Sequence, residues 1–170
     1  LTIRSVGCAC GEEPYTLAMV LSEYARTREH FTFSLLATDI CTSVLEAAHR
    51  GVYEEEKIAP IPLELRRRYL MRSKDRSRKI VRMAPEMRAL ITFRRLNFLD
   101  SEYGIRERLH IIFCRNVLIY FDRPTQEKVI TNFCRHLQPG GHLFLGHSET
   151  INGLDVPLVQ VNSTIYRKPA

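Results

Sequence analysis

The sequence lacks the features that mark a secreted or membrane-spanning protein. It has no run of about 18 apolar residues that could cross a bilayer, and residues 1–7 lack the basic start and long apolar stretch of a secretory signal. We therefore expect a soluble, cytoplasmic protein without membrane insertion. With 170 residues, 45% of them apolar, the chain suffices for one globular domain with a sizeable core. Because it opens inside an apolar run without a starter Met, we also expect a fragment of a longer protein.

Paired cysteine spacing is missing as well. The number of cysteines is odd, and their spacing matches neither a zinc ribbon nor a disulfide scaffold; they are Cys8, Cys10, Cys41, Cys114 and Cys134. We predict reduced thiols and no metal ion. The first four fall near the ends of predicted strands, so a metal or redox-sensing site in one crevice stays open as an alternative.

Positive charge is concentrated in one segment of the chain. Residues 66–95 hold twelve basic residues and two acidic ones, a local charge of +10 within a total of +6, so the remaining residues sum to −4. A local basic surface of this kind indicates an acidic partner.

Strands and helices alternate along most of the chain. Apolar runs predict strands at residues 1–6, 31–38, 91–96, 109–114 and 142–146, and helical spacing predicts helices at 14–28, 41–50 and 124–137. Gly51 is expected to end the second helix in a left-handed cap. Residues 158–161 and 164–167 predict a terminal antiparallel hairpin. The pattern indicates an α/β fold with a mainly parallel sheet, helices on both faces and a ligand site at the carboxyl ends of the strands.

The alternation pauses between residues 52 and 90. This stretch is basic and interrupted by prolines, with a short helical patch at 63–70 and a small hairpin around 80–83. We interpret it as an insertion or subdomain.

Polar residues follow four of the predicted strands. Glu13 lies in the glycine turn that starts at residue 7, and Asp39, Asn97 and Asn116 each follow a later strand. The turn is neither Gly-x-Gly-x-x-Gly nor a phosphate loop, which disfavours classical dinucleotide or ATP binding. Each residue taken alone also fits a turn or a helix cap, as Asp39 does before the second helix. Together they predict one crevice, in which Asp39 could accept hydrogen bonds from a ribose.

Five segments then occur in an order typical of one enzyme family. They are 7–15 (GCACGEEPY), 37–40 (ATDI), Asn97, 113–121 (FCRNVLIYF) and 146–149 (GHSE). Over nearly its whole length the chain resembles the chemotaxis protein-glutamate O-methyltransferases, the CheR family. The resemblance implies a Rossmann-like class I fold dependent on S-adenosylmethionine (SAM) over residues 1–170, with an inserted basic β-subdomain at about residues 68–96.

The resemblance also assigns residues to the cofactor. It implies that Glu13 and the glycine turn at Gly7 contact the methionine portion of SAM or nearby water, and that Asp39 holds the ribose. Asn97 and Phe98 would border the adenine. Transfer of the methyl group would convert SAM to S-adenosylhomocysteine.

Further residues are implied for the methyl group and its acceptor. Arg115 and Asn116 would line the pocket where the methyl group is presented, and Tyr120 would be the catalytic residue that faces the sulfonium and orients the carboxylate. The acceptors would be glutamates in the cytoplasmic domain of a chemoreceptor. His147 is interpreted as structural support near the site.

The chain departs from the family in three respects. Ala9 and Cys10 replace a common Ser-Thr pair, and nothing corresponds to the family's N-terminal helical domain. Residues 72–78 lack the glycines of members that grip a receptor tail, although the basic segment could meet an acidic receptor region directly.

Two other functions stay open. The basic segment could contact phosphates in a nucleic-acid methyltransferase, but Tyr69 is its only aromatic residue before Phe93, so we expect no nucleic-acid partner. The domain could also be a SAM-binding sensor without transfer activity.

Overall fold

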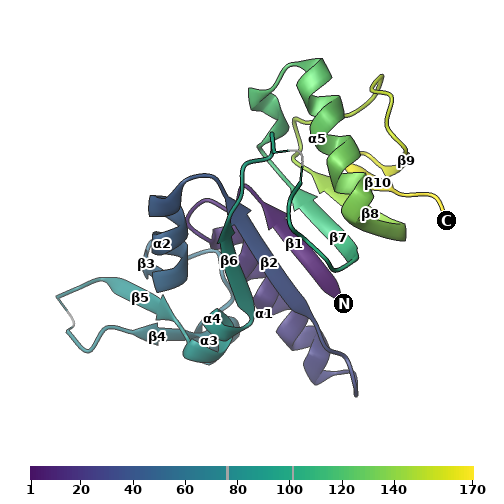
Figure 1. Ribbon diagram of the computed structural model, residues 1–170. Helices are drawn as coiled ribbons and strands as arrows, with labels where there is room; N and C mark the ends of the chain where they lie inside the picture. Colours follow the sequence, from purple (N-terminus) through teal and green to yellow (C-terminus); the bar gives the residue numbers. More distant parts are fainter. Residues whose placement is uncertain (76, 101) are drawn as a thin grey trace.

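The computed structural model describes residues 1–75, 77–100 and 102–170. These residues form a seven-stranded sheet flanked by helices and a separate three-stranded sheet (Figure 1). The larger sheet has the order β6-β2-β1-β7-β8-β10-β9, in which the first five strands are parallel and β10 is antiparallel to both of its neighbours, β8 and β9. Its strands are β1 (Thr2–Val6), β2 (Ser34–Asp39), β6 (Ile91–Arg95), β7 (Leu109–Cys114), β8 (Leu137–Leu145), β9 (Val159–Asn162) and β10 (Ile165–Arg167).

Helices cover both faces of this sheet. The long helices are α1 (Glu12–Arg26), α2 (Thr42–Arg50) and α5 (Arg123–His136). Successive side chains of a strand point to opposite faces. On β7, Ile112 and Cys114 therefore pack in the cluster that contains Phe133 of α5, whereas Ile111 and Phe113 pack in the cluster built on α1 and α2. The expected α/β fold with a mainly parallel sheet and a terminal hairpin is confirmed.

The smaller sheet lies beside the β6 edge of the larger one (Figure 1). It has the antiparallel order β3-β5-β4, from Val52–Glu54, Ile80–Met83 and Leu70–Arg72, and is flanked by α3 (Leu63–Tyr69) and α4 (Pro85–Ala89). The interval 52–90, interpreted from the sequence as an insertion, contains this arrangement, whereas the bounds of about 68–96 implied by the resemblance differ from it at both ends. β3 lies upstream, and β6 belongs to the larger sheet because it pairs with β2 along its length.

The ends of α5 follow from its local sequence. The Asp122 side chain accepts a hydrogen bond from the Thr125 N–H at 3.1 Å, and Pro124 occupies the first turn. β8 starts at Leu137, earlier than predicted, because Leu137 pairs with Leu109 of β7, and Gly140 and Gly141 then exchange backbone hydrogen bonds with Lys168 at 2.9 Å. No helix in the described ranges combines the length and apolar character that a membrane span requires.

Gly51 ends α2 in the predicted left-handed conformation. Its φ is 62°, and its N–H donates to the Ala47 carbonyl at 3.1 Å. A Cβ atom at this position would lie 3.0 Å from the Tyr15 hydroxyl and 3.2 Å from both Arg88 Cδ and Met83 Cβ. The absence of a side chain therefore lets α2 approach α1 and the smaller sheet.

We predict that Gly51→Ala destabilises the fold more than Gly140→Ala. Gly140 has a similar φ of 75°, but a Cβ atom there would meet nothing within 4 Å. Gly140→Ala should therefore lower the free energy of unfolding only by the cost of placing alanine in the left-handed conformation, about 1–2 kcal/mol. Gly51→Ala should add about 1–3 kcal/mol of overpacking. Urea unfolding of both variants measures the difference, and equal losses would contradict the packing role of Gly51.

Candidate functional site

The parallel strands of the larger sheet end in step at one edge. Val6 of β1 pairs with Thr38 of β2 and Cys114 of β7, and Cys114 pairs with Leu145 of β8. The segments after these strands enclose a cavity of about 460 Å³, within the size range of small-molecule sites. This crevice is lined by Gly7, Ala9, Asp39, Ile40, Asn97, Phe98, Leu99, Asn116, Val117, Tyr120 and Phe121.

The turn after β1 comes close to the loop after β7. Gly7 has a φ of 66°, and its N–H donates to the Thr38 carbonyl at 2.8 Å. A Cβ atom on Gly7 would lie 2.5 Å from Val117 Cγ2, so the loop that carries Val117 would have to move. Glycine is therefore required here both for the conformation and for the close approach of the two loops.

Asp39 ties two loops together at the tip of β2. One carboxylate oxygen accepts the Ala9 N–H and the other accepts the Cys41 N–H, each at 3.0 Å. The carboxylate thus fixes the turn before α2 and lines the crevice, but Asp39 is not the N-cap of α2, because the N-cap residue is Cys41 and no side chain among the described residues caps the helix. Each oxygen retains a further lone pair that can accept a hydrogen bond from a ligand hydroxyl.

Asn97 and Phe98 form the wall of the crevice after β6. The Asn97 side-chain oxygen accepts the Leu99 N–H at 3.1 Å, so its amide nitrogen is available to a ligand. The Phe98 ring is 8% exposed and packs edge to face on Phe133, with 6.3 Å between centroids. This wall offers an apolar surface and an amide group side by side.

A buried arginine lies beneath this wall. Arg4 is fully buried in β1, and its guanidinium donates to Thr38 Oγ1 at 3.2 Å from both Nε and Nη2. Its guanidinium carbon lies 4.9 to 5.9 Å from the ring centroids of Phe98, Tyr103 and Phe133. Burial lowers the pKa of Arg4 to about 10. The sequence signal for this contact was a single charge in an apolar strand, and our sequence reasoning missed it.

The loop after β7 carries Asn116 and Tyr120 to the mouth of the crevice. Asn116 has a φ of 59°, and Tyr120 is 78% exposed at the end of the short 3₁₀ helix η1 (Leu118–Tyr120). Beneath the loop lies the buried carboxylate of Glu149, whereas His147, expected as the support, is exposed. Glu149 is the second residue that sequence reasoning missed, although it closes the segment 146–149.

Glu13 and Arg115 lie beside the crevice rather than in its lining. Arg115 Nη1 is 3.3 Å from one oxygen of Glu13, whose other oxygen accepts the Ser5 hydroxyl at 2.7 Å. The structure thus brings six of the eight predicted site residues into one cavity and pairs the other two with each other; the six are Gly7, Asp39, Asn97, Phe98, Asn116 and Tyr120.

The cysteines near the crevice differ in exposure. Cys8 and Cys114 are buried, and burial raises the pKa of Cys8 to about 12 and the pKa of Cys114 well above its ordinary value. Cys41 is exposed, and a hydrogen bond with Ser43 at 3.1 Å lowers its pKa. Among the described residues, no group of three or more His, Cys, Asp or Glu side chains is arranged to hold a metal ion.

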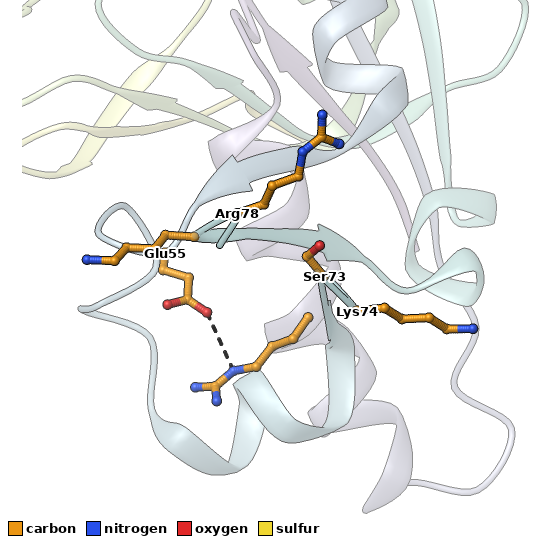
Figure 2. A pocket seen from close by; sticks show the side chains of 6 residues that line it. Glu55, Ser73, Lys74 and Arg78 are labelled. Atoms are coloured by element: carbon orange, nitrogen blue, oxygen red, sulfur yellow. Dashed lines mark ion pairs between the residues drawn. The ribbon is translucent and has the colours of Figure 1, made fainter. Parts of the chain in front are cut away.

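A second cavity, of about 760 Å³, lies on the smaller sheet and is lined by Glu55, Arg72, Ser73, Lys74, Arg78 and Lys79. Arg72 Nε is 3.7 Å from a Glu55 oxygen. Figure 2 shows that the charged ends of Lys74 and Arg78 point in different directions. The cationic groups therefore form a spread basic surface rather than a compact site for one small anion.

We predict that alkylation distinguishes these cysteines. The thiolate is the reactive form, so iodoacetamide at pH 8 should modify Cys41 in the folded protein. Cys8, Cys114 and Cys134 should react only after unfolding, because burial raises their pKa values. Mass spectrometry of timed samples measures the order, and modification of Cys8 or Cys114 as fast as Cys41 would contradict it.

Comparisons with known proteins show the family of the chain. Residues 1–167 match the family described as CheR methyltransferase, SAM binding domain. The chain is 40% identical over 154 residues to a chemotaxis protein methyltransferase of Borreliella burgdorferi, covering 90% of this chain and 53% of that protein. It is 36% identical over 166 residues to chemotaxis protein methyltransferase 2 of Pseudomonas aeruginosa, covering 98% and 59%. The chain thus spans somewhat more than half the length of these curated relatives.

Solved structures support the fold. An O-methyltransferase family protein from Burkholderia thailandensis matches with a TM-score of 0.52 at 17% identity, covering 85% of this chain and 31% of that one. PKMT2 from Rickettsia typhi, solved in complex with AdoHcy, matches with a TM-score of 0.51 at 14% identity, covering 85% and 20%. The class I fold and the SAM cofactor expected from the motifs are confirmed. The chain belongs to the family of CheR methyltransferase SAM-binding domains.

Proposed function

We propose that the protein containing this domain transfers the methyl group of SAM to glutamate side chains of a chemoreceptor and forms glutamyl methyl esters. The observation that carries the proposal is the match of residues 1–167 to the CheR family. The crevice at the carboxyl ends of the strands, with Tyr120 exposed at its mouth, supports it. We place the reaction in the cytoplasm, where the receptor's signalling domain would meet the enzyme.

The crevice residues suit the parts of SAM. Asp39 keeps free lone pairs for the two ribose hydroxyls, and Asn97 with the Phe98 ring matches the polar edge and flat face of adenine. The backbone of Gly7 lines the crevice where the methionine portion would lie, and the Glu13–Arg115 pair beside the turn offers opposite charges to its amino and carboxylate groups. These assignments leave Asn116 and Tyr120 at the end where the methyl group is presented.

The proposed reaction requires few catalytic groups from the protein. When bound, SAM supplies a methyl group already activated by its sulfonium. A glutamate carboxylate oxygen forms the new C–O bond while the methyl–sulfur bond breaks, and the electron pair stays on sulfur. No proton moves, so no general base is needed. Asn116 and Tyr120 would orient the carboxylate in line with the methyl group and exclude water from it.

The basic surface of the smaller sheet supports an acidic partner. Among the described residues, no carboxylate lies within 4 Å of the charged groups of Lys74, Arg78 or Lys79, so these cations are available to another molecule. We propose that this surface meets the acidic methylation region of the receptor. A nucleic-acid acceptor would use the same charges, and the experiment below separates the two.

Methyl transfer tests the proposed function. The full-length protein is incubated with methyl-labelled SAM and chemoreceptor cytoplasmic fragments, and the labelled product is treated with mild alkali. We expect label on the receptor that alkali releases, as it does from carboxyl methyl esters. Label on added RNA would favour the nucleic-acid methyltransferase, and SAM binding without any transfer would favour the sensor.

We predict that Tyr120→Phe slows turnover and leaves cofactor affinity nearly unchanged. Loss of one hydroxyl that orients a charged acceptor should lower kcat about ten- to hundredfold. The Kd for SAM should change less than about threefold, because the other crevice residues remain. Tyr24→Phe, an exposed tyrosine on α1, is the matched control. Equal loss of turnover and affinity would show that Tyr120 belongs to the cofactor site.

We also predict that charge reversal on the smaller sheet weakens receptor binding. The double variant Lys74→Glu with Arg78→Glu should raise the KM for the receptor about tenfold and leave the KM for SAM unchanged. Added salt should reduce the difference in receptor KM between the double variant and the wild type, because exposed charges are screened. Lys128→Glu, on α5, is the control. An unchanged receptor KM would exclude this surface as the docking site.

A further inference from the structure

The carboxylate of Glu149 accepts four backbone hydrogen bonds. One oxygen accepts the N–H groups of Val117 and Leu118, and the other accepts those of Asn116 and Gly146, all at 2.8 Å. The side chain is 5% exposed. Hydrogen bonds from amides to a carboxylate are strong in such surroundings, and they offset the cost of burying the acid. Three of the four donors belong to consecutive residues of the loop after β7.

Two features bring Glu149 under this loop. β7 and β8 are parallel neighbours whose last residues, Cys114 and Leu145, pair, so the segments that follow them start side by side. Gly146 then leaves the space that the carboxylate fills. A Cβ atom on Gly146 would lie 2.7 Å from Glu149 Oε2 and 3.1 Å from the Asn116 nitrogen.

The same loop is held from its other side by Gln126 of α5. Its side-chain amide donates to the carbonyls of Leu118 and Phe121, each at 3.0 Å. The loop backbone is thus fixed through its N–H groups by Glu149 and through its carbonyls by Gln126. No hydrogen bond from the Tyr120 hydroxyl occurs within the described residues. The position of this exposed side chain therefore depends on the loop backbone that carries it.

We infer that Glu149 is a positioning residue for methyl transfer, which holds residues 116–118 so that Asn116 and Tyr120 face the reacting groups. This inference deepens the proposed function and rests on it. Glu149 does not line the crevice, and it acts only through the loop above it.

The first test compares Glu149→Gln with the wild type in the full-length protein. A glutamine places an NH₂ group against two N–H donors, so two of the four bonds are lost. We expect kcat to fall about tenfold and the KM for SAM to change less than about threefold, because Asp39, Asn97 and Phe98 are not displaced. Glu127→Gln is the matched control, since the Glu127 carboxylate accepts one backbone N–H, that of Asp155 at 3.0 Å, away from the loop. Its kcat should equal that of the wild type.

A double-mutant cycle separates positioning from general destabilisation. If Glu149 acts through Tyr120, Glu149→Gln should lower kcat by less than about threefold in a Tyr120→Phe background. An equal loss in both backgrounds, or an unchanged kcat in the single variant, would overturn the inference. If Glu149→Gln does not fold, Gly146→Ala tests the same point, because it displaces the carboxylate without removing it and should lower kcat with the same dependence on Tyr120.

Amide exchange keeps the inference testable apart from activity. Hydrogen–deuterium exchange at residues 116–118 should be at least tenfold faster in Glu149→Gln, and unchanged in Glu127→Gln. If the wild type transfers no methyl group to receptors, the proposed function fails while faster exchange still supports the anchoring of the loop. Unchanged exchange at residues 116–118 would overturn the anchoring itself.

Discussion

The in-step ending of four parallel strands is the constraint on which the rest of the structure depends. The registers place Val6, Thr38, Cys114 and Leu145 at one level across β1, β2, β7 and β8, and β6 continues the row by pairing with β2. Every segment that leaves this edge must therefore share the same space. The glycine turn, Asp39, the Asn97–Phe98 wall and the Asn116–Tyr120 loop are near one another for this reason, although more than 100 residues separate the first from the last.

Two buried charged groups hold this edge from beneath, one on each side of the crevice. Arg4 joins Thr38 to the ring of Phe98 below the wall after β6. Glu149 gathers the amides of the loop after β7. A charged group is costly to bury unless hydrogen bonds or aromatic rings surround it, so each fits only one arrangement of its neighbours. The crevice is thereby preorganised, as the proposed in-line transfer of an activated methyl group requires.

The sequence predicted much of the fold because its signals are local. β7 has the predicted bounds, and α2 with its Gly51 cap differs from the prediction by one residue at its start. Residues 52–90 were identified as an insertion, but the strand β3 within them was not predicted, since it joins the smaller sheet through pairing with β5, about 30 residues away. Periodicity within a segment carries no information on such a partner. The early start of β8 has the same cause, because Leu137 pairs with Leu109 of β7, and Gly140 and Gly141 hydrogen-bond to Lys168 near residue 170.

The candidate site, like the fold, was predicted where its signals are local and missed where they depend on distant parts of the chain. Residues at strand ends could be identified from position and motif, and six of them meet in the crevice. The groups that hold those residues could not, because the contacts of Arg4 and Glu149 depend on loops that meet only in the folded chain. Within the segment 146–149, His147 was predicted to support the site, yet the buried glutamate two residues later makes the contacts. An ionised carboxylate accepts hydrogen bonds and donates none, so it can accept the N–H groups of four converging amides.

The measurement that tests the central claim most directly is a crystal structure of the full-length protein with S-adenosylhomocysteine. We expect the ribose hydroxyls on Asp39, the adenine against Asn97 and Phe98, and the sulfur atom facing Tyr120 across Asn116. A ligand bound elsewhere, or in the crevice with its sulfur directed away from Tyr120, would contradict the assignment of this crevice as the site of methyl transfer.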